Sequence, residues 1–354
     1  MLQNLPFTLI TVAIISGTDH QTIIDILGRR TSAERLAIRQ AYAAISKKAS
    51  TWGKNFIFLL SFLSLSPSVS HCRSKETRGK SLGQALYNDL RGDFRDLAIT
   101  LVKTPWEIMA DAMYKAMKGA GTKERVLNEI LAACSRDDIP EVKKAYEEAY
   151  PKHTLVKDII GDTSGDYRDA LLLVLEGQMD EPSPIQLKKL CPENLSTVIN
   201  SEVAHFDAQL IYSNGEGRLL TPENRFMRPI INRSPWQLYQ SNGVYVEAHG
   251  HSIYDAIKKE TSGDFKNFLL CRVRYALDRP TFYAKLLHFA IAGPGTRDAT
   301  LQRVLAMRAD IDLGTIKERY EELYKEPLSK AITEDTSKYY RKLCLKLVAS
   351  YTDV

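Results

Sequence analysis

The residues best suited to chemistry lie in a short loop, AMKGAGT, at residues 116–122. Glycine has no Cβ, so Gly119 and Gly121 allow the backbone to take positive φ angles and aim successive carbonyl oxygens at one point. Calcium takes six to eight oxygen ligands and accepts carbonyls readily, but neutral carbonyls alone bind it weakly. Asp162, in the segment GDTSGD, is the carboxylate placed to fold back onto this loop. The loop therefore predicts an open calcium site that leaves positions for water or a phosphate group.

The loop belongs to a unit that occurs four times in the chain. A closing segment recurs as LRGDF, TSGDY, TSGDF and TSKYY, centred on Gly92, Gly165, Gly263 and Lys338. An opening segment recurs as GTDHQTI, GTKERVL, LTPENRF and GTRDATL, beginning at residues 17, 121, 220 and 295. Self-similarity of this kind is typical of repeat proteins, in which each unit buries its apolar face against its neighbours. We therefore expect four structural repeats.

Between these segments the apolar residues follow a helical period. The steps are three or four residues, as in the sets Ile23, Ile24, Leu27 and Val126, Leu127, Ile130, Leu131. Strand-like alternation is scarce, so we predict an all-α fold with about five helices in each unit. Thr122 and Thr296 precede an acidic residue at short spacing, which is typical of helix N-caps.

Two segments depart from the repeat. Residues 178–204 predict an extended linker between the second and third units, in which Pro182 and Pro184 end the preceding helix and Ser183 or Pro184 begins a short new one. Residues 49–79 predict an insert in the first unit, because joining Lys48 to Lys80 restores the pattern of the second unit. We hypothesise that this insert and the first fifteen residues are gene-model or splicing artefacts. The alternative is a genuine surface loop.

Composition and charge argue against several classes of protein. The formal net charge of +5 is small and scattered over 354 residues, so nucleic acid is not an expected partner. The five cysteines are odd in number and include no C-x-x-C pair, which favours reduced intracellular thiols over a disulfide framework or zinc site. The apolar runs at 5–15 and 56–65 are shorter than the roughly 20 residues of a membrane span. Since no nucleophile or acid–base constellation stands out, we do not expect an enzyme.

The K-G-x-G-T loop, the acidic residue about forty positions later and the closing T-S-G-D-[FY] segment resemble the annexin core, and their fourfold repetition makes the resemblance specific. The resemblance implies four annexin-type repeats of about five helices each, in a curved disc. Their expected bounds are 1–104 for repeat 1, 105–177 for repeat 2, 178–204 for the linker, 205–278 for repeat 3 and 279–354 for repeat 4. The long linker resembles that of flatworm annexins.

By this resemblance, each calcium site uses three loop carbonyls and one distant carboxylate. Repeat 2 matches in full, with Met117, Gly119, Gly121 and Asp162, and repeat 4 supplies Ile291, Gly293, Gly295 and Asp335. Weaker candidates are Gly17 and Asp89 in repeat 1 and Gly215, Arg218 and Glu260 in repeat 3. Leu220 replaces a loop glycine in repeat 3, and a leucine at positive φ is costly, so we expect that site to be weak or silent. Repeat 1 has Ala13 and Ile15 at the other carbonyl positions and is incomplete.

The resemblance implies calcium-dependent binding to acidic phospholipid membranes such as those rich in phosphatidylserine, with membrane scaffolding or bridging. Lys118, Lys123 and Arg125 flank the repeat 2 loop and would add attraction to an acidic surface. The expected location is cytoplasmic, peripheral on the inner face of the plasma membrane, and export to the cell surface without a signal peptide stays open.

The alternative function is a calcium-independent helical scaffold that binds proteins through the linker or the N-terminus. Self-association on membranes also stays open. Trp106 and Trp236 each follow a proline between helical segments, and we expect both to pack rather than to insert into a bilayer.

Overall fold

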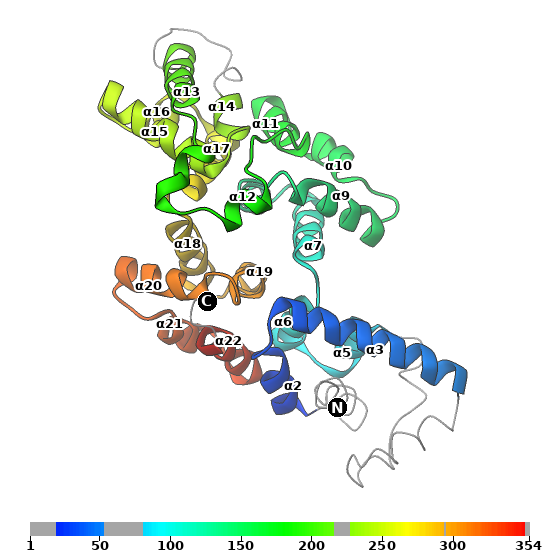
Figure 1. Ribbon diagram of the computed structural model, residues 1–354. Coiled ribbons are helices and arrows are strands. Elements are labelled where there is room, and N and C mark those ends of the chain that lie inside the picture. The colour runs from blue at the N-terminus through cyan, green and yellow to red at the C-terminus, as the bar shows by residue number, and fades with distance from the viewer. Residues whose placement is uncertain (1–18, 53–80, 216–226, 294, 351–354) are drawn as a thin grey trace. The chain divides into compact units, whose positions relative to one another are not determined.

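The computed structural model describes residues 19–52, 81–215, 227–293 and 295–350, and these residues are predominantly helical (Figure 1). Within these ranges there is no β-strand, and the one isolated β-bridge joins Asp180 to Arg233. The prediction of an all-α fold is confirmed. None of the described helices is both long and apolar enough to cross a membrane.

Repeat 2 shows the five-helix unit in full. Its helices are α7 (Pro105–Met117), α8 (Glu124–Leu131), α9 (Asp138–Ala149), α10 (Leu155–Asp162) and α11 (Gly165–Leu175). Leu127, Ile130 and Leu131 are buried on one side of α8, as the helical period predicted. The short helix α10 has a side-chain cap, because Thr154 accepts a hydrogen bond at 3.4 Å from the backbone N–H of Lys157.

The other repeats follow the same order of helices. Repeat 3 contains α13 (Ser201–Asn214), α14 (Met227–Ile231), α15 (Pro235–His249), α16 (Ile253–Glu260) and α17 (Gly263–Leu277). Repeat 4 contains α18 (Arg279–Ile291), α19 (Asp298–Arg308), α20 (Leu313–Tyr324), α21 (Leu328–Asp335) and α22 (Lys338–Ser350). Repeat 1 contains α2 (His20–Leu27), α3 (Ser32–Trp52), α5 (Leu82–Asp89) and α6 (Gly92–Leu101). The atypical start and residues 53–79 of the insert lie outside the described residues.

The linker between repeats 2 and 3 carries two short helical segments, α12 (Pro184–Lys188) and the 3₁₀ helix η3 (Pro192–Thr197). Ser183 is the N-cap of α12, and Gln186 completes a capping box by accepting a hydrogen bond from the Ser183 backbone N–H at 2.9 Å. The helix start expected at Ser183 or Pro184 is therefore confirmed.

The chain divides into two compact units, and each contains two repeats. One unit, Met1–Pro105 with Tyr283–Val354, contains repeats 1 and 4, whereas the other, Trp106–Phe282, contains repeats 2 and 3. In the first unit α6 packs against α19 and α22, and in the second α17 packs against α8, α11 and α14. These contacts bury the apolar sides of the helices, with Leu97, Leu301 and Leu343 fully buried in the first unit.

One buried arginine joins the two repeats of the second unit. Arg272 of α17 is 1% exposed. It donates hydrogen bonds at 3.0 Å to the carbonyls of Ala132 in repeat 2 and Arg233 in repeat 3, and at 3.2 Å to that of Ile231. Burial lowers the pKa of this guanidinium, while the negative charge of Glu181 raises it. The carbonyl acceptors compensate for the loss of hydration that burial imposes on the charge.

A tight turn precedes the last helix of each repeat, and it accounts for the recurring closing segment. The residue that begins the last helix has positive φ in all four repeats, namely Gly92 (59°), Gly165 (58°), Gly263 (63°) and Lys338 (51°). In repeats 2, 3 and 4 a buried threonine before this residue donates its hydroxyl to the carbonyl four residues earlier, in the pairs Thr163–Ile159, Thr261–Ile257 and Thr336–Ile332. Lys338 is therefore strained where its counterparts are glycine.

Candidate metal centre

The loop of repeat 2 joins the end of α7 to the start of α8. Gly119 and Gly121 have φ angles of 111° and 83°, the left-handed conformations that the sequence predicted. The loop is closed at its base, where the backbone N–H of Lys123 donates a 2.9 Å hydrogen bond to the carbonyl of Ala116. A Cβ at either glycine would meet no described atom within 4 Å. The requirement for glycine therefore comes from the backbone angle and not from crowding.

The distant carboxylate lies against this loop. Asp162 is the last residue of α10, and its backbone carbonyl and its Oδ2 atom each accept a 3.2 Å hydrogen bond from the Thr122 hydroxyl. Asp162 is exposed, so its other carboxylate oxygen is accessible to a cation in solvent. The structure thus brings together Gly121 and Asp162, which the sequence separates by about forty residues.

Repeat 4 reproduces the loop geometry. Gly293 and Gly295 have φ angles of 110° and 82°. The backbone N–H of Arg297 closes the loop with a 2.8 Å hydrogen bond to Ala290, and the Thr296 hydroxyl donates at 3.1 Å to the backbone carbonyl of Asp335, the last residue of α21. The two glycines therefore take the same φ angles in two loops of different sequence. Pro294 lies outside the described residues.

The carboxylate of repeat 4 differs from that of repeat 2. The Oδ2 atom of Asp335 is buried and accepts no hydrogen bond from any residue that the structure describes. A buried, unpaired carboxylate oxygen is costly, and a cation would satisfy it. Nearby, burial raises the pKa of Asp298, and the negative charges of Asp93 and Asp335 add to that rise. The surroundings of Asp335 therefore favour a bound cation.

The two loop threonines are not N-caps, so that prediction was wrong. The N-caps of α8 and α19 are Lys123 and Arg297, and neither makes a side-chain capping bond. Thr122 and Thr296 instead hold the loop to the end of the helix that carries the carboxylate. The sequence offered one signal for this role, a threonine that follows the second loop glycine in both repeats. An N-cap would give the same pattern.

The donor atoms suit a hard cation bound mainly by backbone oxygen. No group of three or more His, Cys, Asp or Glu side chains able to hold a metal occurs in the described ranges. The sequence pattern assigns one carboxylate to each candidate centre, Asp162 or Asp335, and its remaining protein ligands would be loop carbonyls. Calcium tolerates such mixed oxygen sets, whereas zinc prefers nitrogen and sulfur ligands. The residues present fit calcium.

The weaker candidates are only partly described. Asp89 ends α5 and Glu260 ends α16, the positions that Asp162 and Asp335 occupy in their repeats. Gly215 has a φ of −112°, and a Cβ on it would lie 4.0 Å from Cγ of Glu260, so these two residues are adjacent. Gly17 and Arg218 lie outside the described residues, as do Ala13, Ile15 and Leu220.

Charge around the repeat 2 loop is mixed. Arg125 forms an ion pair with Glu129, with 2.7 Å between Nε and Oε1, so part of its positive charge is offset. The Lys118 ammonium lies over the Tyr114 ring, 5.6 Å from its centroid. Beside Asp162 a cavity of about 310 Å³ is lined by three further carboxylates, those of Glu124, Asp166 and Asp264. This cavity makes the surroundings of Asp162 attractive to cations.

The repeats match a known family. The annexin family model matches residues 15–49, 109–174, 206–271 and 282–347. The first match stops at residue 49, where the insert was placed from the sequence. The four repeats predicted from the closing and opening segments are therefore confirmed.

Individual proteins are similar over nearly the whole chain. The chain is 36% identical to annexin B22 of Schistosoma mansoni over 95% of this chain and 85% of that protein. It is 34% identical to annexin A1 of Sus scrofa over 94% of this chain and 83% of that protein. Among solved structures, calcium-bound annexin (Sm)1 superposes with a TM-score of 0.81 at 32% identity, covering 99% of this chain and 91% of that one.

Proposed function

Because the chain belongs to the annexin family, we propose that it binds acidic phospholipid membranes through calcium ions held at the loops of repeats 2 and 4. Annexins bind membrane phospholipids, generally with calcium, and are generally non-enzymatic and cytosolic proteins peripheral to membranes.

The proposed ligands are three loop carbonyls and one carboxylate at each site. They are Met117, Gly119, Gly121 and Asp162 in repeat 2, and Ile291, Gly293, Gly295 and Asp335 in repeat 4. The observation that carries this assignment is the shared loop conformation, with glycine φ angles that agree within 1° and a threonine holding each loop to its carboxylate helix. The buried, unpaired Oδ2 atom of Asp335 supports it further.

Calcium would bridge the protein to the membrane. Four protein oxygens leave two to four positions of the six- to eight-coordinate shell for water or lipid oxygens. Lipid phosphate or serine-headgroup oxygens would complete that shell. Lys118 and Lys123 would each add about 1 kcal/mol of attraction near an acidic surface. Two sites on one chain would raise the apparent affinity by avidity, and a chelator would reverse the binding because the carboxylates repel acidic lipid.

The proposal extends to the repeat bounds, location and partners. We assign the repeats and linker to 1–104, 105–177, 178–204, 205–278 and 279–354, and we regard Asp89 and Glu260 as parts of weaker sites. The membrane is the phosphatidylserine-rich inner face of the plasma membrane. Scaffolding or bridging there requires only that several sites engage lipid at once.

Co-sedimentation with phosphatidylserine vesicles tests the proposal. The wild-type chain should pellet with vesicles in calcium and return to the supernatant in chelator. The double variant Asp162→Asn/Asp335→Asn should stay in the supernatant at calcium concentrations that pellet the wild type. Glu334→Gln is the matched control, because it removes an exposed carboxylate one residue from Asp335, and it should pellet normally.

The same experiment separates the alternative function. A calcium-independent protein-binding scaffold would leave the chain in the supernatant with or without calcium. If the wild type stays in the supernatant in calcium, as the double variant does, the membrane proposal is contradicted.

A further inference from the structure

Helix α15 of repeat 3 exposes an apolar stripe to solvent. Trp236, Tyr239, Gly243 and Val246 follow one another at steps of three, four and three residues, which places them on one side of the helix. Trp236 is 38% exposed, Tyr239 58% and Val246 40%. The expectation that Trp236 packs is therefore wrong, whereas Trp106 is half-buried and donates a 2.9 Å hydrogen bond to Asp138.

The corresponding helices of repeats 2 and 4 do not share this stripe. Alignment on the buried tyrosines Tyr146, Tyr245 and Tyr320 gives the equivalent positions. They are Asp137, Pro140, Lys144 and Glu147 in repeat 2, and Ile311, Gly314, Glu318 and Glu321 in repeat 4. Five of these eight residues are charged, so the repeat fold does not require apolar residues there. The stripe on α15 is a feature of repeat 3 alone among these three repeats.

An acidic cavity lies at the N-terminal end of the same helix. It has a volume of about 740 Å³ and is formed by the linker and the first turns of α13 and α15. Its wall includes the carboxylate residues Asp180, Glu181 and Glu202, and none of its lining residues is Lys or Arg. Gln237, the residue that α15 contributes to the wall, directly follows Trp236. The stripe therefore begins within one residue of the cavity.

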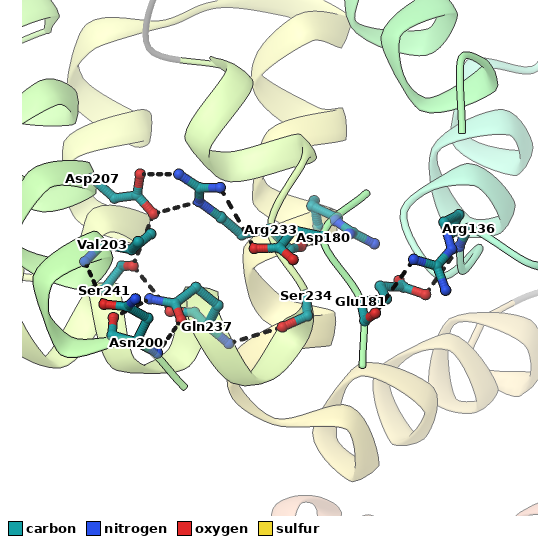
Figure 2. A network of polar contacts seen from close by, with 11 residues as sticks. Arg136, Asp180, Glu181, Asn200, Val203, Asp207, Arg233, Ser234, Gln237 and Ser241 are labelled. Carbon is teal, nitrogen blue, oxygen red and sulfur yellow. Dashed lines mark hydrogen bonds and ion pairs between the residues drawn. The ribbon is translucent and has the colours of Figure 1, made fainter. Parts of the chain in front are cut away.

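The cavity is held in shape by a polar network (Figure 2). Asn200 and Gln237 exchange two hydrogen bonds, one from the Asn200 backbone N–H at 2.8 Å and one from the Gln237 amide at 2.9 Å. Glu181 accepts a 3.0 Å hydrogen bond from the backbone N–H of Arg136. Arg233 forms two hydrogen bonds with the buried carboxylate of Asp207, at 2.8 and 3.0 Å. Such a preformed wall loses little conformational entropy when a ligand binds.

We propose that the stripe and the cavity form a docking surface for an amphipathic helix of a protein partner, with apolar side chains on the stripe and a basic side chain in the cavity. The spacing along Trp236, Tyr239, Gly243 and Val246 is the spacing of a helix–helix seam, and Gly243 allows close approach of a second backbone. The seam is about 15 Å long at a rise of 1.5 Å per residue.

Charge decides between a protein and a membrane as the occupant. Of the three carboxylates in the cavity wall, that of Asp180 is partly offset by the Arg233 guanidinium at 3.7 Å. Glu181 and Glu202 therefore supply most of the negative charge that repels acidic lipid and attracts lysine or arginine. Burial raises the pKa of the Glu181 carboxyl, so a neighbouring cation would favour its ionised form. An aromatic stripe with an acidic end therefore suits a basic peptide better than a membrane surface.

Fluorescence anisotropy of the full chain with a labelled amphipathic leucine–lysine peptide tests the proposal. The solution contains chelator, so the result does not depend on calcium-mediated membrane binding. The peptide should bind saturably and about ten-fold or more tightly than a leucine–glutamate peptide of the same pattern. Glu202→Gln should weaken only the binding of the basic peptide.

The stripe itself is tested by Gly243→Lys/Val246→Glu, which installs the residues that α9 carries at these positions. This variant should lose about ten-fold or more of the affinity, with an unchanged circular dichroism spectrum. Leu323→Glu on α20 is the matched control, because Leu323 is also 40% exposed, and it should bind as the wild type does.

Three kinds of result would overturn the proposal. The first is a failure of the peptide assay, either no saturable binding or equal binding by wild type and Gly243→Lys/Val246→Glu. The second is binding to phosphatidylserine vesicles in chelator that this double variant abolishes, which would make a membrane the occupant. The third is a dimer of the chain that the same variant dissociates.

Discussion

The loops of repeats 2 and 4 have the same glycine φ angles, but their carboxylates differ in burial and in hydrogen bonding. Their glycine φ angles agree within 1°, yet the Oδ2 atom of Asp162 is paired with Thr122 and the Oδ2 atom of Asp335 is buried without a partner in the described chain. The glycines therefore determine the conformation of the loop. The surroundings of the carboxylate at the end of the neighbouring helix determine how much a bound cation would stabilise it. Repeat 4 should lose more stability than repeat 2 when calcium is absent.

The largest expected effect comes from removing each carboxylate separately. Asp162→Asn and Asp335→Asn should each weaken calcium binding at their own loop by about 10-fold or more, since a carboxylate supplies the only ligand charge. Isothermal titration calorimetry of both variants checks this. In chelator Asp335→Asn should stabilise the protein by about 1 kcal/mol, because it removes a carboxylate with one buried oxygen that accepts no hydrogen bond from the described residues. Asp162→Asn should change stability by less than about 0.5 kcal/mol. If the two variants change stability equally in chelator, the carboxylates of repeats 2 and 4 do not differ in the way described.

A smaller effect is expected at the tight turn that follows each carboxylate. Lys338 and Gly165 occupy equivalent positions, with φ angles of 51° and 58°. Lys338→Gly should stabilise the protein by about 1 kcal/mol through relief of left-handed strain, and Gly165→Lys should destabilise it by a similar amount. A Cβ at Gly165 would meet no described atom within 4 Å, so no clash obscures the comparison. Chemical unfolding measures both, and a destabilised Lys338→Gly variant would refute the strain argument.

The smallest effect concerns pH, at the aromatic pair one turn before each loop. His288 stacks on Tyr324 in repeat 4, and Tyr114 stacks on Tyr150 in repeat 2, each with ring centroids 3.6 Å apart. Burial lowers the pKa of His288 from its usual 6.5, although Glu326 opposes the shift. Its contribution to stability is therefore present above about pH 6.5 and is lost as the pH falls through the lower folded pKa.

His288→Tyr should reduce the loss of stability between pH 7 and pH 5.5, and Tyr114→His should increase it. Thermal unfolding at the two pH values measures both changes. If the slope between these pH values is the same in His288→Tyr and wild type, His288 is not the group responsible.

The repeats, the all-α class and the conformation of the loop glycines could be predicted from the sequence. Each depends on local spacing or on a backbone angle that glycine favours. The role of Thr122 was misassigned, because a capping threonine and one that bonds the distant Asp162 look alike in sequence. The exposure of Trp236 was missed, because a proline before tryptophan does not reveal which side of the helix is covered. The unpaired oxygen of Asp335 depends on tertiary packing, and no sequence pattern reports it.

Arg272 has a consequence for how the second unit unfolds. Its carbonyl acceptors are divided between repeat 2 and repeat 3, so opening either repeat alone leaves a buried guanidinium without part of its hydrogen bonding. Leaving a buried donor without its hydrogen-bond acceptors costs about 1–3 kcal/mol, and more when the donor is charged. Partial opening of one repeat is therefore disfavoured relative to opening both, and the amides of α8 and α17 should exchange with deuterium as one cooperative group.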